Sequence, residues 1–138
     1  MIELTRRYAF PAAHVLRSES LGERENERIF GKCANPNGHG HNYGVEVTVS
    51  GRVEPVSGQI LPPSELDRIF EQVVMEPFSH RMLNEASAFN GIVPTAENIA
   101  LVLQELLAPE IERRTNAELS RVRVIETSRN SCEVGEFR

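Results

Sequence analysis

Alternation between two kinds of side chain is most regular from His39 to Ser50. One set takes every second position: His39, His41, Tyr43, Val45, Val47 and Val49. A period of two places this set on one face of a β-strand, so this stretch predicts a strand. Residues 2–14 are also expected to be extended, because apolar residues fall mostly at even positions: Ile2, Leu4, Tyr8 and Phe10.

Two later segments follow the period of an amphipathic helix instead. The first has apolar residues at i, i+3, i+4, i+7 and i+8: Leu66, Ile69, Phe70, Val73 and Val74. Ser64, which follows two prolines, is the expected N-cap of this helix. The second repeats the pattern: Ile99, Val102, Leu103, Leu106 and Leu107. Thr95, after Pro94, is its expected N-cap.

The rest of the chain is less regular. Residues 15–37 are polar and predict a long loop with one helical turn, which is typical of a functional or disordered segment. Residues 77–93 are expected to be irregular, and strands are expected over 121–127 and 132–137. The order strand, strand, helix, helix, strand, strand predicts one α+β domain over residues 1–138, with its helices on one face of an antiparallel sheet.

Composition narrows the classes of partner. A net charge of −5 argues against non-specific binding to nucleic acid or to an anionic membrane. No apolar run is long enough to span a bilayer, and no apolar signal segment begins the sequence. The two cysteines, Cys33 and Cys132, are too few for a disulfide framework, which favours a cytoplasmic protein.

The placement of the four histidines suggests a metal site. His39 and His41 share a face at one end of the predicted strand, with Cα atoms roughly 6.5–7 Å apart. Two imidazoles at that spacing can meet one zinc ion through bonds of about 2.0–2.1 Å. The alternative is a chance pair of polar residues at a strand end.

His14 ends the first extended segment. If the first two strands pair antiparallel across the long loop, His14 lies close to His39 and His41. Three nitrogen ligands with the fourth position open are typical of a catalytic zinc site. Considered alone, His14 would be an ordinary capping or surface histidine.

Cys33 lies in the loop just before the histidine pair, and its residue type leaves three roles open. It could be a fourth zinc ligand, a thiolate base whose pKa is lowered by Lys32 and the metal, or a small buried hydrophobic residue. Cys132 has no comparable neighbours and is assigned no role.

Glu126 shares a strand face with Val122 and Val124, so its carboxylate points toward an otherwise apolar surface. A buried carboxylate needs a partner, and a ligand with adjacent N–H donors would supply one. The alternatives are an exposed strand end or an ion pair with Arg129.

The segment from Phe30 to Tyr43, FGKCANPNGHGHNY, resembles the signature of the 6-pyruvoyl-tetrahydropterin synthases. Four shorter segments support the resemblance over nearly the whole chain: 10–14, 77–80, 94–98 and 124–127. The resemblance implies the tunnelling fold, in which a four-stranded antiparallel sheet is backed by two helices. Three such sheets close into a β-barrel, trimers stack in pairs, and active sites lie at subunit interfaces.

The same resemblance implies a role for each matching residue. His14, His39 and His41 match the zinc ligands, which makes Zn²⁺ the expected cofactor. The catalytic pair is matched by Cys33, as the base, and by His80. The substrate-binding positions are matched by two further residues: Glu126, which anchors the pterin ring, and Thr95.

The implied reaction converts 7,8-dihydroneopterin triphosphate to 6-pyruvoyl-tetrahydropterin, with loss of triphosphate. One departure from the family pattern is Ser79, where an aspartate usually precedes the catalytic histidine. A serine cannot stabilise an imidazolium by charge, so a catalytically impaired zinc- and pterin-binding protein is one alternative.

Another alternative is the related 6-carboxy-tetrahydropterin synthase of queuosine synthesis. In that branch the cysteine commonly lies four residues before the first histidine of the pair. Here Cys33 precedes His39 by six residues, as in the pyruvoyl-forming branch.

Overall fold

A computed structural model describes residues 1–136 and contains one antiparallel sheet. Its strands lie in the order β1 (Ile2–His14), β2 (His39–Gly51), β3 (Glu118–Thr127) and β4 (Asn130–Gly135). The predicted α+β class and four-stranded sheet are therefore confirmed. The last strand was expected to reach Phe137, a residue that lies outside the described part of the chain.

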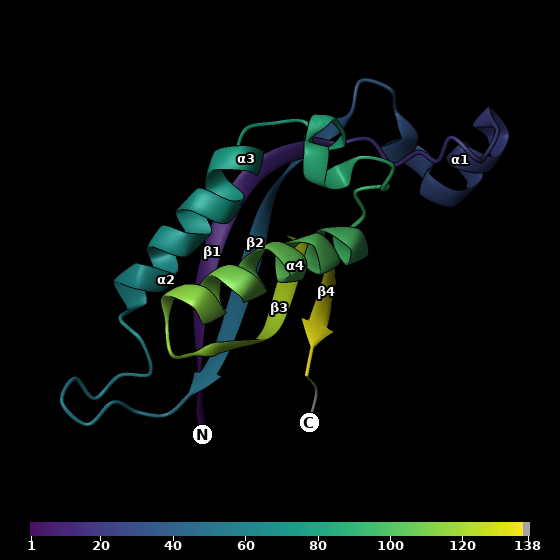
Figure 1. Ribbon diagram of the computed structural model, residues 1–138. Helices are drawn as coiled ribbons and strands as arrows, with labels where there is room; N and C mark the ends of the chain where they lie inside the picture. Colours follow the sequence, from purple (N-terminus) through teal and green to yellow (C-terminus); the bar gives the residue numbers. More distant parts are fainter. Residues whose placement is uncertain (137–138) are drawn as a thin grey trace.

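Helices cover one face of this sheet (Figure 1). α2 (Pro63–Phe70) continues through the π-helical turn η2 (Glu71–Met75) into α3 (Glu76–Phe78), and α4 (Ala96–Arg114) runs beside them. The expected Thr95 cap is confirmed, because its Oγ1 accepts a hydrogen bond from the Asn98 N–H at 3.2 Å. The expected Ser64 cap is wrong: α2 begins at Pro63, whose missing N–H and fixed φ suit the first helical position.

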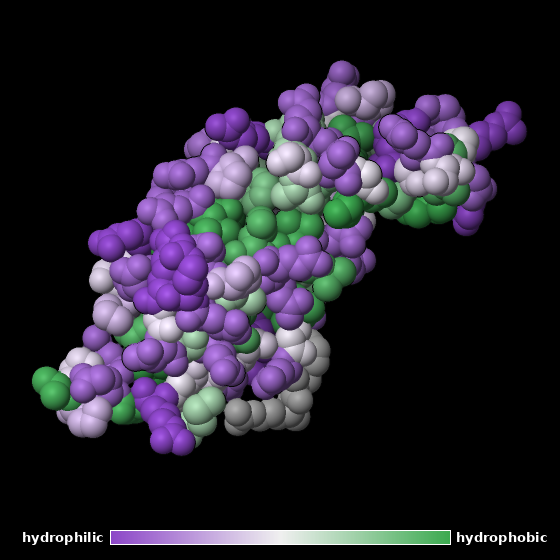
Figure 2. Space-filling view, in the orientation of Figure 1, coloured by the Kyte–Doolittle hydropathy of each residue, from purple (hydrophilic) through white to green (hydrophobic). Residues whose placement is uncertain are grey.

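The core lies between the helices and the buried face of β2. From Tyr43 onward the alternate residues of β2 are at most 1 % exposed. They belong to one apolar cluster with residues of the two long helical segments, including Leu66, Phe70, Ile99 and Leu103. The period-two pattern therefore identified the buried face of β2 correctly. Apolar side chains are visible between the helices in the space-filling view (Figure 2).

The opposite face of the sheet is charged. Glu46 on β2 pairs with Arg7 at 2.9 Å and with Arg123 at 3.4 Å, while Arg121 pairs with Glu3 at 2.9 Å. These residues alternate with the buried ones along their strands, so they point away from the helices. The apolar core therefore lies on only one face of the sheet, although Thr48 and Ser50 on the charged face are also buried.

Residues 15–37 are more ordered than expected. They contain α1 (Glu23–Phe30) and the 3-10 helix η1 (Gly31–Ala34), where one helical turn was predicted. The side chain of Asn26, only 1 % exposed, bonds to the backbone of Ser18 and Leu21, which folds the loop against α1. α1 extends beyond the end of the sheet (Figure 1). Within the described residues, no helix has the length and apolar character needed to cross a membrane.

Candidate metal centre and active site

The register of β1 and β2 brings three histidines together. His14 lies opposite His39, and Ala12 lies opposite His41, so the three rings share one end of the sheet. Their candidate ligand nitrogens all lie within 4.8 Å of one another. Antiparallel pairing across the long loop, which the sequence analysis required for this arrangement, is confirmed.

His14 is fully buried and held through both ring nitrogens. Its Nδ1 lies 2.8 Å from the Pro94 carbonyl oxygen and 3.0 Å from the Tyr43 hydroxyl. Its Nε2 lies 2.8 Å from Nε2 of His39. A carbonyl oxygen only accepts, so Nδ1 carries the hydrogen and Nε2 is left with a free lone pair in the cluster.

The chemistry of this cluster fits a metal ion. Nδ1 of His39 and Nε2 of His41 are buried, with no hydrogen-bond partner among the described residues. Burial lowers the pKa of His14 and of His39, and the neighbouring imidazoles lower both further. Both rings are therefore neutral near pH 7, which is the form that binds metals.

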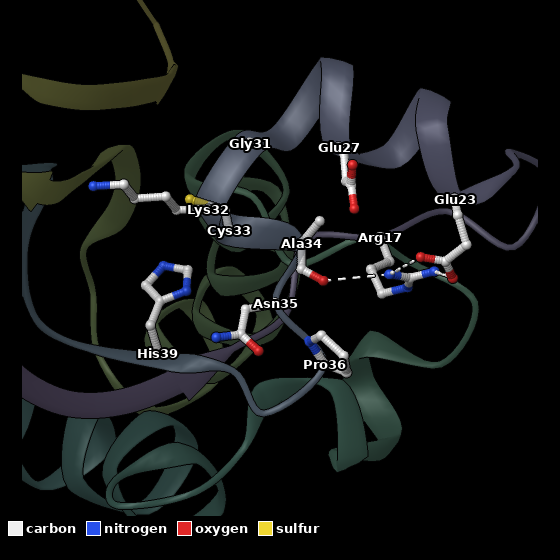
Figure 3. A pocket seen from close by; sticks show the side chains of 10 residues that line it. All are labelled: Arg17, Glu23, Glu27, Gly31, Lys32, Cys33, Ala34, Asn35, Pro36 and His39. Carbon is white, nitrogen blue, oxygen red and sulfur yellow. Dashed lines mark hydrogen bonds and ion pairs between the residues drawn. The ribbon is translucent and has the colours of Figure 1, made fainter.

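A cavity of about 730 Å³ lies beside the histidine cluster. His39, Cys33 and Lys32 gather at one end of it, while Arg17 pairs with Glu23 at the other (Figure 3). The Cys33 carbonyl accepts a hydrogen bond from the Leu16 N–H at 2.7 Å, which ties η1 to the end of β1. A thiol therefore lies in the same cavity as a candidate metal ligand.

Cys33 does not join the metal cluster, which consists of the three histidines alone among the described residues. Burial, and secondly the charge of Glu126, raise the pKa of its thiol. The lowering of this pKa by Lys32 together with the metal stays a prediction. Of the three roles left open by the sequence, that of fourth ligand is disfavoured.

His80 lies in a different place. It is exposed and lines another cavity, of about 580 Å³, together with His41 of the histidine cluster and with Gly40 and Met82. Its φ of 60° is uncommon for a residue with a side chain, and its N–H donates to the Pro11 carbonyl at 2.6 Å. The structure thus does not bring His80 and Cys33 into one cavity of a single chain.

Glu126 lies near the end of β3, and Thr95 is the N-cap of α4. Glu126 is half-buried and accepts a hydrogen bond from the Asn130 side chain at 3.2 Å, rather than pairing with Arg129, which was one of the alternatives. Its charge raises the pKa of Cys33 and opposes the lowering at His14, which places the carboxylate near both groups. Thr95 directly follows Pro94, whose carbonyl holds His14.

Two further side chains near the site, Tyr43 and Asn84, were not among the predicted site residues. Tyr43 was assigned only to the alternating strand face, although it lies two positions after His41 on that face. The Asn84 side chain accepts from the Val15 N–H at 2.8 Å and donates to the Val15 carbonyl at 2.9 Å. This contact spans 69 residues of sequence, so no local pattern could reveal it.

Cys132, to which no role was assigned, donates a hydrogen bond to Glu97 at 3.3 Å. Burial, followed by this bond, raises the pKa of its thiol to about 11. Cys132 is therefore a protonated thiol at neutral pH, unlike a reactive cysteine.

Comparison with known proteins gives one consistent family. The family model described as 6-pyruvoyl tetrahydropterin synthase matches residues 3–136. The human protein named 6-pyruvoyl tetrahydrobiopterin synthase is 38% identical over 129 residues, which cover 93% of this chain and 87% of that protein. The protein of the same name from Dictyostelium discoideum is 37% identical over 128 residues, covering 92% of this chain and 90% of its own length.

A solved structure agrees with these sequences. The 6-pyruvoyl tetrahydropterin synthase of Caenorhabditis elegans superposes with a TM-score of 0.87 at 34% identity. The alignment covers 99% of this chain and 96% of that one. The likeness therefore extends over the sheet, the helices and the segments that carry the candidate site.

Proposed function

Because the chain belongs to the 6-pyruvoyl tetrahydropterin synthase family, we propose that it is a zinc-dependent, phosphate-eliminating lyase. It converts 7,8-dihydroneopterin triphosphate to 6-pyruvoyl-tetrahydropterin and releases triphosphate. The observation that carries the proposal is the cluster of His14, His39 and His41, whose member His39 lines the same cavity as Cys33. The low cysteine content supports a cytoplasmic site of action.

Zinc is the proposed metal because the donor set consists of three neutral imidazoles, with no fourth protein ligand in the cluster. His14, His39 and His41 would hold the ion, which would supply Lewis-acid polarisation of the hydroxyl groups on the substrate side chain. The Pro94 carbonyl keeps His14 in the tautomer whose Nε2 is free to bind.

Cys33 is the proposed base, and its thiolate takes a proton from a side-chain carbon of the substrate. The raised pKa of this thiol in the chain alone leaves little thiolate at neutral pH. Positive charge close to the thiol lowers its pKa, so Cys33 becomes an effective base only in the metal-loaded site.

Glu126 is the proposed anchor of the pterin ring. Its carboxylate would accept hydrogen bonds from the 2-amino group and an adjacent ring N–H of the substrate. Its half-buried position near the histidine cluster supports this role. Thr95, at the start of α4, is the second proposed contact to the pterin.

We further propose a homo-oligomer, either a trimer or a dimer of trimers, closed into a β-barrel. Barrel closure removes sheet edges, and the charged face of this sheet would then line the interior. His80 and Cys33 line separate cavities of one chain, which supports a site that is completed by His80 of a neighbouring copy. His80 then exchanges protons with the substrate from the other side.

The proposal is tested by incubating the zinc-loaded protein with 7,8-dihydroneopterin triphosphate, and then measuring triphosphate release and product mass. Release of triphosphate with the mass of 6-pyruvoyl-tetrahydropterin is the expected result. Metal-free protein and Cys33→Ala are the matched controls: the first should be inactive, and the second should keep only a small residual rate. Tight pterin binding without triphosphate release would instead identify an impaired binding protein, and a 6-carboxy product would assign the chain to the related branch.

A further inference from the structure

The hydroxyl of Tyr43 contacts a candidate metal ligand inside the core. Tyr43 and His14 are each 0 % exposed, and the Tyr43 oxygen lies 3.0 Å from Nδ1 of His14. Because both groups are buried, water does not compete for the hydrogen bond between them. The hydroxyl is thus one of a fixed set of partners for this ring.

The Pro94 carbonyl determines the direction of this hydrogen bond. That oxygen lies 2.8 Å from the same nitrogen and can only accept, so Nδ1 of His14 carries a hydrogen. The Tyr43 oxygen is then a second acceptor for that N–H group. Two acceptors from different parts of the chain hold the ring in one tautomer and one orientation, with Nε2 directed at His39.

Both acceptors are firmly placed. Pro94 precedes the first turn of α4, where the Thr95 N–H and the Asn98 side chain each donate to the Val93 carbonyl at 2.8 Å. Tyr43 is in the central part of the sheet, and its ring packs on Phe10 with centroids 5.3 Å apart. The ring of Tyr43 therefore has a packing role that is separate from the role of its hydroxyl.

We propose that Tyr43 is a positioning residue for the metal, acting through the ring of His14. Its hydroxyl, with the Pro94 carbonyl, orients the imidazole before the ion arrives and increases the affinity of the site. Groups that hold the second nitrogen of a ligating histidine commonly have this effect. The inference rests on the proposed zinc site but not on the reaction that the site performs.

The test is Tyr43→Phe, which removes one oxygen and keeps the ring packed on Phe10. Zinc affinity of the metal-free, full-length protein is measured by competition with a chromophoric chelator. The variant should bind zinc about 10–100-fold more weakly than the wild type. Tyr8→Phe is the matched control, because it removes the hydroxyl of a half-buried tyrosine that bonds to Asp67 instead of a histidine, and it should leave zinc affinity unchanged.

A folded Tyr43→Phe variant that binds zinc as tightly as wild type would overturn the proposal. A second measurement needs no variant: nitrogen NMR of the zinc-loaded wild type should show hydrogen on Nδ1 of His14, and an unprotonated Nδ1 would also overturn it. Loss of affinity in Tyr43→Phe together with an inactive wild type would uphold the positioning role and reject the proposed reaction. Failure of the wild type to bind zinc would reject the positioning role.

Discussion

The strand ends that carry His14, His39 and His41 are held differently from the segments that carry Cys33 and His80. The histidines occupy paired positions of two adjacent strands, and the register of one chain sets their spacing. Cys33 and His80 lie on short segments whose side chains face separate cavities. The comparison indicates that one chain can preorganise the metal centre, whereas the proposed proton transfer would draw on a second copy of the chain.

The largest expected effect is the loss of the metal. His39→Ala removes one of three nitrogen donors and should reduce zinc affinity by more than ~100-fold, with activity lost in parallel. Atomic absorption after gel filtration measures the bound zinc. His80→Ala is the control and should retain zinc while losing activity. Equal zinc loss in His39→Ala and His80→Ala would show that His80 is also needed to hold the metal.

Removal of the proposed base should come next in size. Cys33→Ala should lower the turnover number by about 10²–10⁴-fold while zinc remains bound. Cys132→Ala is the matched control, since that thiol is bonded to Glu97 and should leave turnover near the wild-type value. Near-normal turnover in Cys33→Ala would assign the base to another group.

The pH profile sharpens the assignment of Cys33. Burial raises the pKa of this thiol and a bound cation would lower it, and thiolate is the reactive form, so activity should increase with pH up to the pKa that Cys33 has in the metal-loaded site. The residual activity of Cys33→Ala should not show this increase with pH. Initial rates between pH 6 and pH 9, roughly the range around the thiol's ordinary pKa, give the measurement. The same increase of activity with pH in Cys33→Ala would assign the titration to a different residue.

The smallest expected effect concerns the two hydrogen bonds between the Asn84 side chain and the backbone of Val15. They tie residues 80–84, the His80 segment, to the end of β1. Asn84→Ala removes two hydrogen bonds to Val15 and should lower the free energy of unfolding by about 1–2 kcal/mol. Turnover should decrease modestly. Zinc affinity should stay unchanged, because the pairing of β1 with β2 does not depend on these two hydrogen bonds. Urea unfolding and chelator competition test these two expectations. A large loss of zinc would show that the metal centre depends on the His80 segment.

The same contrast explains what could be predicted from sequence. The alternation through His39 and His41 predicts both a strand and a shared face, and antiparallel pairing then adds His14. Local periodicity carries no comparable information for α1, whose residues are mostly polar and whose buried residue is Asn26. The cap of α2 was misplaced because Ser64 is a good capping residue by type, but Pro63 already satisfies the first turn.

The roles of Tyr43 and Asn84 depend on partners that are distant in sequence. His14 is 29 residues from Tyr43, and Val15 is 69 residues from Asn84. The pairing of Cys33 with His80 rests on the family resemblance, because the geometry of a single chain does not join them. The expected zinc ligands could thus be derived from residue spacing, whereas the proton carriers could not.

Subunit complementation tests most directly whether the site is shared between copies. Cys33→Ala and His80→Ala chains are unfolded together, refolded together and assayed against each variant refolded alone. The account predicts activity in the mixed oligomers at about a quarter of the wild-type value, because sites form where an intact Cys33 meets an intact His80 of a neighbour. Mixed oligomers that form and bind zinc but stay as inactive as the separate variants would contradict it.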